Sequence, residues 1–317
     1  MEQNANRLLI VSSSPHIRSG RSTRGIMLDV IIALIPTLVA GCVIFGLRAL
    51  AVTLACVASA VLAEIVFNAI CKRPHTIDDL SAVVTGLLLG LNLPAGTAIW
   101  QASLGSVFAI VVVKCLFGGL GKNFANPAIA ARVMMLISFP SAMGTAAALK
   151  VSSVDAVASA TPLAIIKNGG MPAQSLVDML LGLRSGAIGE TCIIALALGG
   201  AYLFIRRVIT WHTPVMFILG VYLLSWLVYG DAELALYLLF SGGVFLGAIF
   251  MATDYVTTPT TAWGKVIFGL GCAVFTVVIR RWSAYPEGVS FSILLMNILT
   301  PYIEKATIKK PLGEVKA

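Results

Sequence analysis

The sequence carries very little charge. Only 11% of its 317 residues are Asp, Glu, Lys or Arg, and its mean hydropathy is +0.95. Soluble globular proteins carry about 25% charged residues, which they need to cover a water-facing surface. The composition therefore excludes the two soluble domains that the length would allow, and it predicts one polytopic membrane domain with short loops.

Clustered metal ligands and a soluble catalytic centre are also missing. The six cysteines are scattered singly, without a CxxC or ferredoxin-type run, so this chain offers no local iron–sulfur or zinc signature. A cluster shared with a partner chain stays open. The three histidines are isolated, and no Ser/His/Asp or Cys/His arrangement follows from spacing. No aromatic-basic interleaving indicates a nucleic-acid surface.

A cleavable signal peptide is not expected either. Residues 1–24 are too polar for one and read as a basic cytoplasmic tail, after which the first apolar segment acts as an uncleaved anchor.

Long apolar segments dominate the remaining sequence. A spanning helix needs roughly 20 mostly apolar residues, and only helices satisfy their own backbone groups in lipid. We therefore expect an all-α fold. The expected transmembrane helices are ten, at residues 25–47, 49–70, 80–93, 99–117, 125–143, 186–205, 214–229, 234–251, 263–279 and 289–302.

The distribution of positive charge predicts the topology. With both termini inside, sixteen of the 22 lysines and arginines fall on the inner face, Lys114 and Arg132 among them. Arg280 and Arg281 fit this scheme worst, and they indicate either an outer pocket or an error in the ninth segment. The loop 144–185 then lies outside, and residues 304–317 form an inner tail.

The segments divide into two halves of five, 25–143 and 186–303. A short third helix in the first half matches a break at ATDYVTTPTT in the second, and GLGKNFANPAIAAR matches YPEGVSFSILLMN. Halves with an odd number of spans insert with opposite orientation, and paired broken helices of inverted repeats usually line a binding site or pathway.

The longest polar interruption contains VDAVASATPLAII, residues 154–166. Thr161 followed by proline is a good helix start, because the hydroxyl caps free N–H groups and proline suits the first turn. The context also resembles a D-x-x-[ST]-G-A-T site, where a transferase joins flavin mononucleotide (FMN) to threonine. Asp155, Ser159, Ala160 and Thr161 supply the match, although Ala158 and Ser159 depart from the usual Ser/Thr and Gly.

GGLGKNFANPAIAAR offers a second candidate site. Asn126-Pro127-Ala128 is typical of a helix N-terminus, and the aquaporin fold would need two such motifs where we find one. With Lys122 and Asn123 nearby, this N-terminus would attract an anionic or electron-rich ligand such as a flavin ring or a quinone.

Acidic residues near membrane depth form a third group. Asp254, in ATDYVTTPTTAWGK with Thr258, is either a solvated cap or a contact for a flavin or a cation. Glu64 lies well inside the second apolar segment, which makes it the best buried candidate. Either acid is a candidate for ion coupling. We expect Lys114 to snorkel towards the lipid head groups.

Taken together, these stretches resemble a known family. SSPHIRSGRSTRGIMLDVIIALIPT, TGLLLGLNLP, GGLGKNFANPAIAAR, SATPLA, ATDYVTTPTT and YPEGVSFSILLMN occur in this order. The ordered set is similar to the RnfD component of the Rnf ion-translocating electron transport complex, whose sister is the NqrB component of the sodium-pumping NADH:quinone reductase. The sister's long N-terminal extension is not seen here, which favours the Rnf side.

The resemblance implies a multi-pass subunit of a bacterial or archaeal cytoplasmic membrane, with ten helices in two inverted five-helix repeats. It implies FMN bound covalently to Thr161 and a second, non-covalent flavin such as riboflavin. Its implied partners are a flavin transferase, a second covalent-flavin subunit, intramembrane iron–sulfur subunits, and cytoplasmic subunits that handle NADH and ferredoxin. The expected function is an electron relay coupled to sodium or proton translocation.

Two other classes remain open on the residues alone. A urea-transporter-like channel without redox chemistry would explain the single NPA motif and the repeat. A passive assembly scaffold would tolerate replacement of Thr161 without loss of electron transfer.

Overall fold

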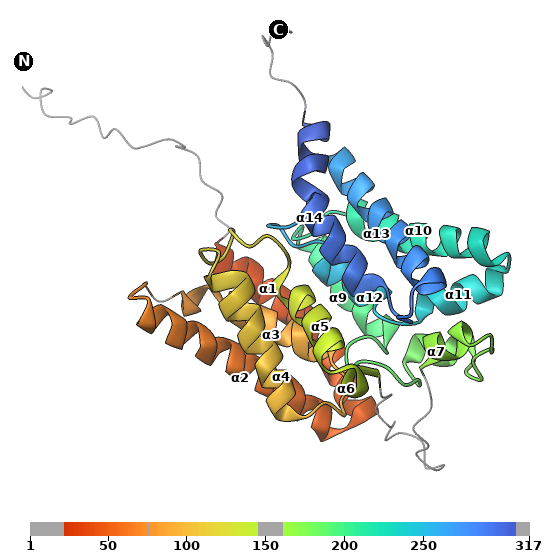
Figure 1. Cartoon of the computed structure of the whole chain (residues 1–317), viewed down its shortest axis with the longest axis horizontal. Helices are drawn as coiled ribbons and strands as arrows, with labels where there is room; N and C mark the ends of the chain where they lie inside the picture. The colour runs from red at the N-terminus through yellow and green to blue at the C-terminus, as the bar shows by residue number, and fades with distance from the viewer. Residues whose placement is uncertain (1–21, 75, 145–160, 309–317) are drawn as a thin grey trace, which may run out of the picture.

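The computed structural model describes residues 22–74, 76–144 and 161–308. These ranges form helices and loops without a strand. In Figure 1 the helices of the first half, coloured red to yellow, gather beside those of the second half, coloured green to blue. The all-α prediction is confirmed for the described residues.

The first half contains α1 to α6. Their bounds are α1 Thr23–Phe45, α2 Leu47–Ile70, the 3-10 turn η1 Ile77–Asp79, α3 Ser81–Asn92, α4 Ile99–Phe108 with its π-helical continuation η2 Ala109–Cys115, α5 Pro127–Ser138 and α6 Pro140–Gly144.

Two short helices, α7 Pro162–Lys167 and α8 Leu176–Leu181, lie in the loop between the halves. The second half follows with α9 Ile193–Ile205, α10 His212–Tyr229, α11 Ala232–Phe240, α12 Val244–Leu246, the π-helix η3 Gly247–Met251, α13 Ala262–Trp282 and α14 Val289–Thr307.

All ten predicted segments coincide with helices, but fewer are long enough to span a membrane. Four are long and apolar enough, namely α1, α2, α10 and α13. A fifth candidate is α11 joined to residues 244–251, a pair bent by 64°. The shorter apolar helices are α3, α4 with η2, α5 and α9. The structure thus supports a polytopic protein, and the number of ten spans stays a prediction.

Helix starts follow the side chains that can cap them. The Ser22, Asn126 and Thr161 side chains each accept a backbone N–H of the first turn of α1, α5 and α7. Pro127 and Pro162 begin two of these helices, where the missing N–H costs nothing. Gly46, with φ of 78°, separates α1 from α2. The predicted caps at Asn126 and Thr161 are confirmed.

Helix packing is alike in the two halves. In the first, α2 contacts α3 and α4, and α4 contacts α5; in the second, α10 contacts α11 and α13, and α13 contacts α14. The halves meet where α1 packs on α9 and α5 packs on α14. Each of these joins the first or fifth helix of one half to its counterpart in the other.

Large apolar side chains remain exposed along the outer helices. Leu54, Leu62 and Val66 of α2 and Leu219 and Leu227 of α10 are more than half exposed. A monomeric soluble protein rarely leaves apolar surface of this extent open. Lipid-facing helices account for it, which agrees with the composition.

Candidate functional site

Two cavities lie at opposite ends of α3 and α5. The first, here the Thr161 cavity, contains Asn92 at the end of α3 and Leu136 near the end of α5. The second, the Asp254 cavity, contains Ser81 at the start of α3 and Asn126 at the start of α5. Both are built from segments of both halves.

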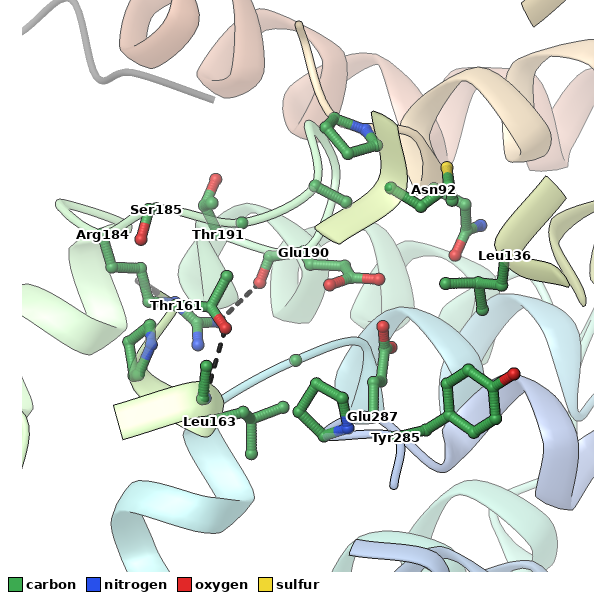
Figure 2. A pocket seen from close by; sticks show the side chains of 18 of the residues that line it. Asn92, Leu136, Thr161, Leu163, Arg184, Ser185, Glu190, Thr191, Tyr285 and Glu287 are labelled. Atoms are coloured by element: carbon green, nitrogen blue, oxygen red, sulfur yellow. Dashed lines mark hydrogen bonds between the residues drawn. The ribbon is translucent and has the colours of Figure 1, made fainter. Parts of the chain in front are cut away.

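The Thr161 cavity has a volume of about 230 Å³ (Figure 2). This is just below the roughly 300 Å³ at the low end of small-molecule sites. Thr161 is half-buried, so a group joined to its hydroxyl would be only partly enclosed. The polar side chains around it are Asn92, Arg132, Arg184, Ser185, Glu190, Thr191, Tyr285 and Glu287.

Thr161 is the N-cap of α7. Its Oγ1 accepts a hydrogen bond from the Ala164 backbone N–H at 3.3 Å. The capping interpretation is therefore correct, yet the same hydroxyl borders the cavity. A cap bond of this length leaves the oxygen accessible, so capping does not exclude modification.

A buried ion cluster forms the deep wall of the cavity. The Arg132 guanidinium donates to carboxylates of Glu190 and Glu287, the latter at 2.5 Å, and to the Asn92 amide oxygen. Arg132 and Glu190 are each 4% exposed. Buried charges of this kind persist only when paired and hydrogen-bonded. Arg132 was counted with the charges of the inner face; its side of the membrane is not tested, and the structure shows that its charge is satisfied inside the protein.

Two further buried arginines lie close by. Arg280 donates to the Leu238 and Ser241 carbonyls at 2.6 and 3.0 Å, at the C-terminus of α11. Its burial beside the bend between α11 and α12 explains why this arginine fits the charge count poorly. Arg184 donates to the Glu190 carbonyl at 2.7 Å. Burial lowers the pKa of the Arg184 guanidinium to about 10, which still leaves it charged at neutral pH.

Several buried polar atoms of the Thr161 cavity lack a hydrogen-bond partner within the described ranges. They are Nε of Arg132, Nε of Arg184 and Oγ1 of Thr191. A buried polar group that makes no hydrogen bond costs about 1–3 kcal/mol, so these atoms are candidates for hydrogen bonds with a ligand. Two of the three are cationic donors. The residues present therefore fit a ligand that carries hydrogen-bond acceptors and negative charge.

The Asp254 cavity has a volume of about 90 Å³. Asn126 lines it, and its amide N–H also donates to the Met251 carbonyl at 3.4 Å. Asn123 lines it as well, while its amide donates to the Ala125 carbonyl. Asp254 is half-buried and accepts from the Thr257 hydroxyl at 3.1 Å. The structure thus brings three of the predicted site residues together.

Other predicted residues lie elsewhere. Lys122 is exposed and lines neither cavity. Thr258 is buried and donates to the Asp254 carbonyl at 2.6 Å, but it borders a third cavity next to Lys265. Asp155, Ser159 and Ala160 lie outside the described residues, so their predicted role is not tested.

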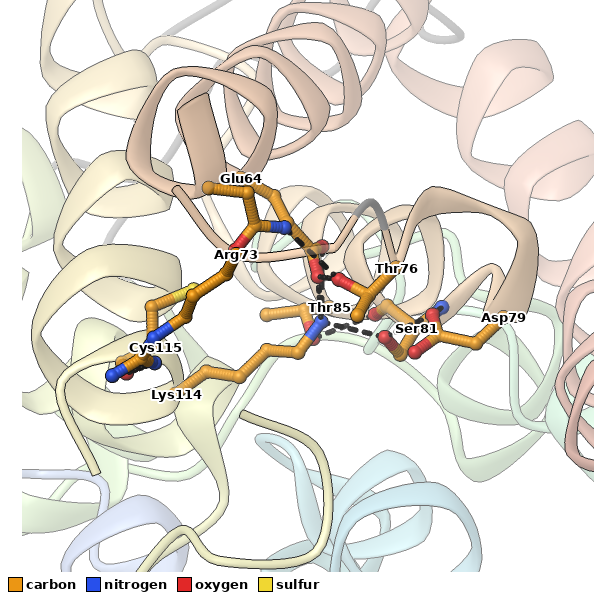
Figure 3. Close-up of polar contacts among 9 residues, drawn as sticks. Glu64, Arg73, Thr76, Asp79, Ser81, Thr85, Lys114 and Cys115 are labelled. Atoms are coloured by element: carbon orange, nitrogen blue, oxygen red, sulfur yellow. Dashed lines mark hydrogen bonds and ion pairs between the residues drawn. The ribbon is translucent and has the colours of Figure 1, made fainter. Parts of the chain in front are cut away.

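Glu64 belongs to a second buried ion cluster (Figure 3). Both of its oxygens lie 2.9 Å from Lys114 Nζ, and one accepts from the Thr76 hydroxyl at 2.5 Å. Lys114 also donates to Ser81 Oγ at 2.6 Å. The prediction that Lys114 snorkels is wrong: its side chain is 3% exposed, because the π-helix η2 presents it to Glu64 rather than to lipid.

The loops group according to the predicted sidedness. Residues 94, 184–185 and 285–287, all expected outside, line the Thr161 cavity. Residues 120, 123, 208–209 and 253–256, all expected inside, line the Asp254 cavity. Loops assigned to the two faces by charge alone therefore meet at different ends of the molecule.

Sequence reasoning missed Arg184, Glu190 and Glu287. The carboxylates are 58 and 155 residues from Arg132, so spacing could not pair them. A signal was present nonetheless, since an acid just inside the sixth apolar segment needs a buried partner.

Comparison with known proteins identifies the family. A model of the NQR2, RnfD, RnfE family matches residues 10–313. The chain belongs to this family. The resemblance to RnfD drawn from the ordered motifs is thereby confirmed.

Named relatives in the NQR2, RnfD, RnfE family cover nearly the whole chain. The D component of the Na(+)-translocating ferredoxin:NAD(+) oxidoreductase complex of Acetobacterium woodii is 47% identical, covering 97% of this chain and 96% of that protein. The proton-translocating counterpart of Clostridium ljungdahlii is 42% identical over 95% of each chain. The D component of the ion-translocating oxidoreductase complex of Marinobacter nauticus is 39% identical over 98% and 97%. These relatives are subunits of redox-driven translocases.

Proposed function

We propose that this protein is the flavin-carrying membrane subunit of an ion-translocating ferredoxin:NAD oxidoreductase complex of the Rnf type. Family membership and the names of the relatives support the complex. The observation that supports flavin on this subunit is Thr161, whose hydroxyl borders a cavity with unpartnered cationic donors. The isolated subunit would be an electron carrier without complete activity.

FMN would be attached through a phosphoester at Thr161 Oγ1. A flavin exchanges one or two electrons, which suits a relay between iron–sulfur centres and nicotinamide. The chain's own residues would hold the group: Thr161 anchors it, and the deep wall with Arg132 supplies donors. Asp155, Ser159 and Ala160 would form the recognition site of the flavin transferase.

Covalent attachment is tested by ultraviolet in-gel fluorescence of the denatured subunit, produced with an active flavin transferase. We expect a fluorescent wild-type band that Thr161→Val abolishes and Thr161→Ser retains, because serine keeps a hydroxyl. Thr191→Val is the matched control, since Thr191 lines the same cavity and should not be the anchor. A dark wild-type band beside a labelled positive control would refute this function.

A second, uncharged flavin such as riboflavin is the candidate ligand of the Asp254 cavity. Asp254 has no cation within ion-pair distance in the described part of the chain, so a carboxylate there disfavours a phosphate and accepts from hydroxyl or ring N–H groups. At about 90 Å³ the cavity is too small for a whole flavin ring without movement of side chains. Denaturation of the wild-type protein should release one non-covalent flavin per polypeptide, and the Asp254→Ala variant should release less. This result would support the assignment.

Glu64 and Asp254 are the candidates for ion coupling. Both are acids near membrane depth, and Lys114, the partner of Glu64, lines the Asp254 cavity. A cation could therefore compete with Lys114 for the same carboxylate. The assembled complex in proteoliposomes provides the test: neutralising Glu64 and Asp254 together should lower the number of ions moved per electron. An unchanged number of ions per electron would contradict this proposal.

We further propose ten spans in two inverted repeats, with both termini inside. The matching helix contacts of the halves support the repeat. Each cavity also combines the segment before the fifth helix of one half with the segment after the third helix of the other, as a two-fold relation requires. A channel without redox chemistry is the competing function, and colourless purified protein with an active transferase would favour it.

A further inference from the structure

Three buried arginines lie around the Thr161 cavity, and they differ in how their charge is compensated. Arg132 meets two carboxylates, Glu190 and Glu287. Arg280 meets two carbonyls at the C-terminus of α11, the negative end of a helix dipole. Among the described residues, Arg184 donates only to the Glu190 carbonyl and pairs with no carboxylate.

The surroundings of Arg184 make this unusual. It is 2% exposed, and its Nε is buried without a partner in the described part of the chain. No described carboxylate lies within 4.0 Å of its guanidinium nitrogens. An uncompensated buried charge is costly, and proteins normally pair it with an opposite charge.

The pairing of the charges around the cavity gives the sign of the missing group. The carboxylates that line the cavity, Glu190 and Glu287, both pair with Arg132, and no described carboxylate pairs with Arg184. A partner for Arg184 would therefore be an anion. A phosphodiester carries one negative charge, as each phosphate of a DNA strand does, and guanidinium forks match its two free oxygens.

Arg184 also lies on the side of the cavity where the phosphate would be. Arg184 and Thr161 line the same cavity, and Figure 2 draws the Arg184 side chain over Thr161 in projection, whereas Asn92, Tyr285 and Glu287 are drawn farther away in this view. A phosphoester on Thr161 Oγ1 begins within one bond of the threonine. Arg184 is thus the buried cation that lacks a carboxylate partner in the cavity that Thr161 lines, while carboxylates hold the terminal nitrogens of Arg132.

We infer that Arg184 is a positioning residue that pairs with the phosphoester joining flavin to Thr161. This inference rests on the proposed covalent FMN. Before attachment Arg184 has no carboxylate partner among the described residues; after attachment the phosphodiester would be its anionic partner. Flavin attachment therefore stabilises the protein through Arg184, in addition to any contact made by the flavin ring.

The test compares thermal stability with and without flavin. Wild type, Arg184→Met and Arg184→Lys are each produced with and without the transferase, and the flavin content per polypeptide is measured by absorbance. Samples are then heated to a series of temperatures, and the midpoint temperature at which the monodisperse protein is lost is determined by size-exclusion chromatography in detergent. Arg281→Gln is the matched control, because Arg281 neighbours Arg280 on α13 but is not buried.

We expect flavin attachment to raise the wild-type midpoint and the Arg281→Gln midpoint equally. In Arg184→Met the increase should fall below half of the wild-type value, and the flavin-free variant should melt no lower than flavin-free wild type. Arg184→Lys, which keeps the charge, should retain most of the increase. If Arg184→Met cannot be purified, Arg184→Gln provides the same comparison.

An increase in Arg184→Met equal to that of wild type would overturn the inference while leaving covalent FMN intact. A wild-type protein that carries no covalent flavin, beside a labelled control, would instead overturn the proposed function.

Discussion

At the scale of single residues, the molecule buries charged side chains in its interior and pairs them there. Lys114 and Arg132 each hold a carboxylate that comes from a distant part of the chain. Replacing a whole buried pair by apolar residues is often nearly neutral, whereas removing one partner costs about 3–5 kcal/mol. The two clusters therefore differ from surface charges in how they respond to substitution.

Glu64 and Lys114 provide the clearest case. Glu64→Met should destabilise the protein strongly, because Lys114 would remain buried without its carboxylate, and Lys114→Met should do the same in reverse. The double variant should be more stable than either single variant. Thermal midpoints of the four proteins complete a double-mutant cycle, and additive losses would show that the pair is not energetically coupled.

At the scale of elements, close helix contacts depend on glycine. In α9, a Cβ at Gly199 would collide with the carbonyl oxygen of Ala33 in α1. This contact joins the two halves of the molecule.

Gly199→Ala should push α1 and α9 apart and destabilise the protein by about 1–3 kcal/mol, the usual cost of overpacking. Flavin attachment at Thr161 should persist, because α7 does not depend on this contact. Gly96→Ala is the control, since a Cβ there meets nothing within 4 Å. Equal thermal midpoints for the two variants would contradict the prediction.

The π-helices show where element-level prediction fails. Hydrophobic segments located the long apolar helices, and the caps Asn126 and Thr161 were readable because their bonds are local. The wider turns of η2 and η3 leave no composition signal. The direction of Lys114 depends on η2, so its environment could not be predicted from the sequence.

At the scale of the whole molecule, sidedness is the main property still to be measured. Single cysteines at two exposed positions, Lys122→Cys and Met171→Cys, distinguish the faces. Only Cys71, Cys42 and Cys192 need prior replacement, because the other cysteines are buried.

With both termini inside, a membrane-impermeant maleimide should label Lys122→Cys only in inverted vesicles and Met171→Cys only in right-side-out vesicles. Labelling of both from one side would refute the proposed orientation of the repeats.

The candidate site was only partly predictable at this scale. Thr161, Asn126 and Asp254 were found from motifs, because capping and turn chemistry are local. The convergence of Arg132, Glu190 and Glu287 was not, because long-range pairing is decided by the packing of the two halves.

The separation of the two cavities has an electrical consequence. They lie at opposite ends of α3, whose twelve residues extend about 18 Å at 1.5 Å per residue. That is about 60% of the roughly 30 Å hydrocarbon layer. If the proposed flavins occupy the two cavities, an electron that passes between them would cross part of the transmembrane voltage. Since a full crossing changes free energy by about 2.3 kcal/mol per 100 mV, this step alone would change by about 1.4 kcal/mol per 100 mV.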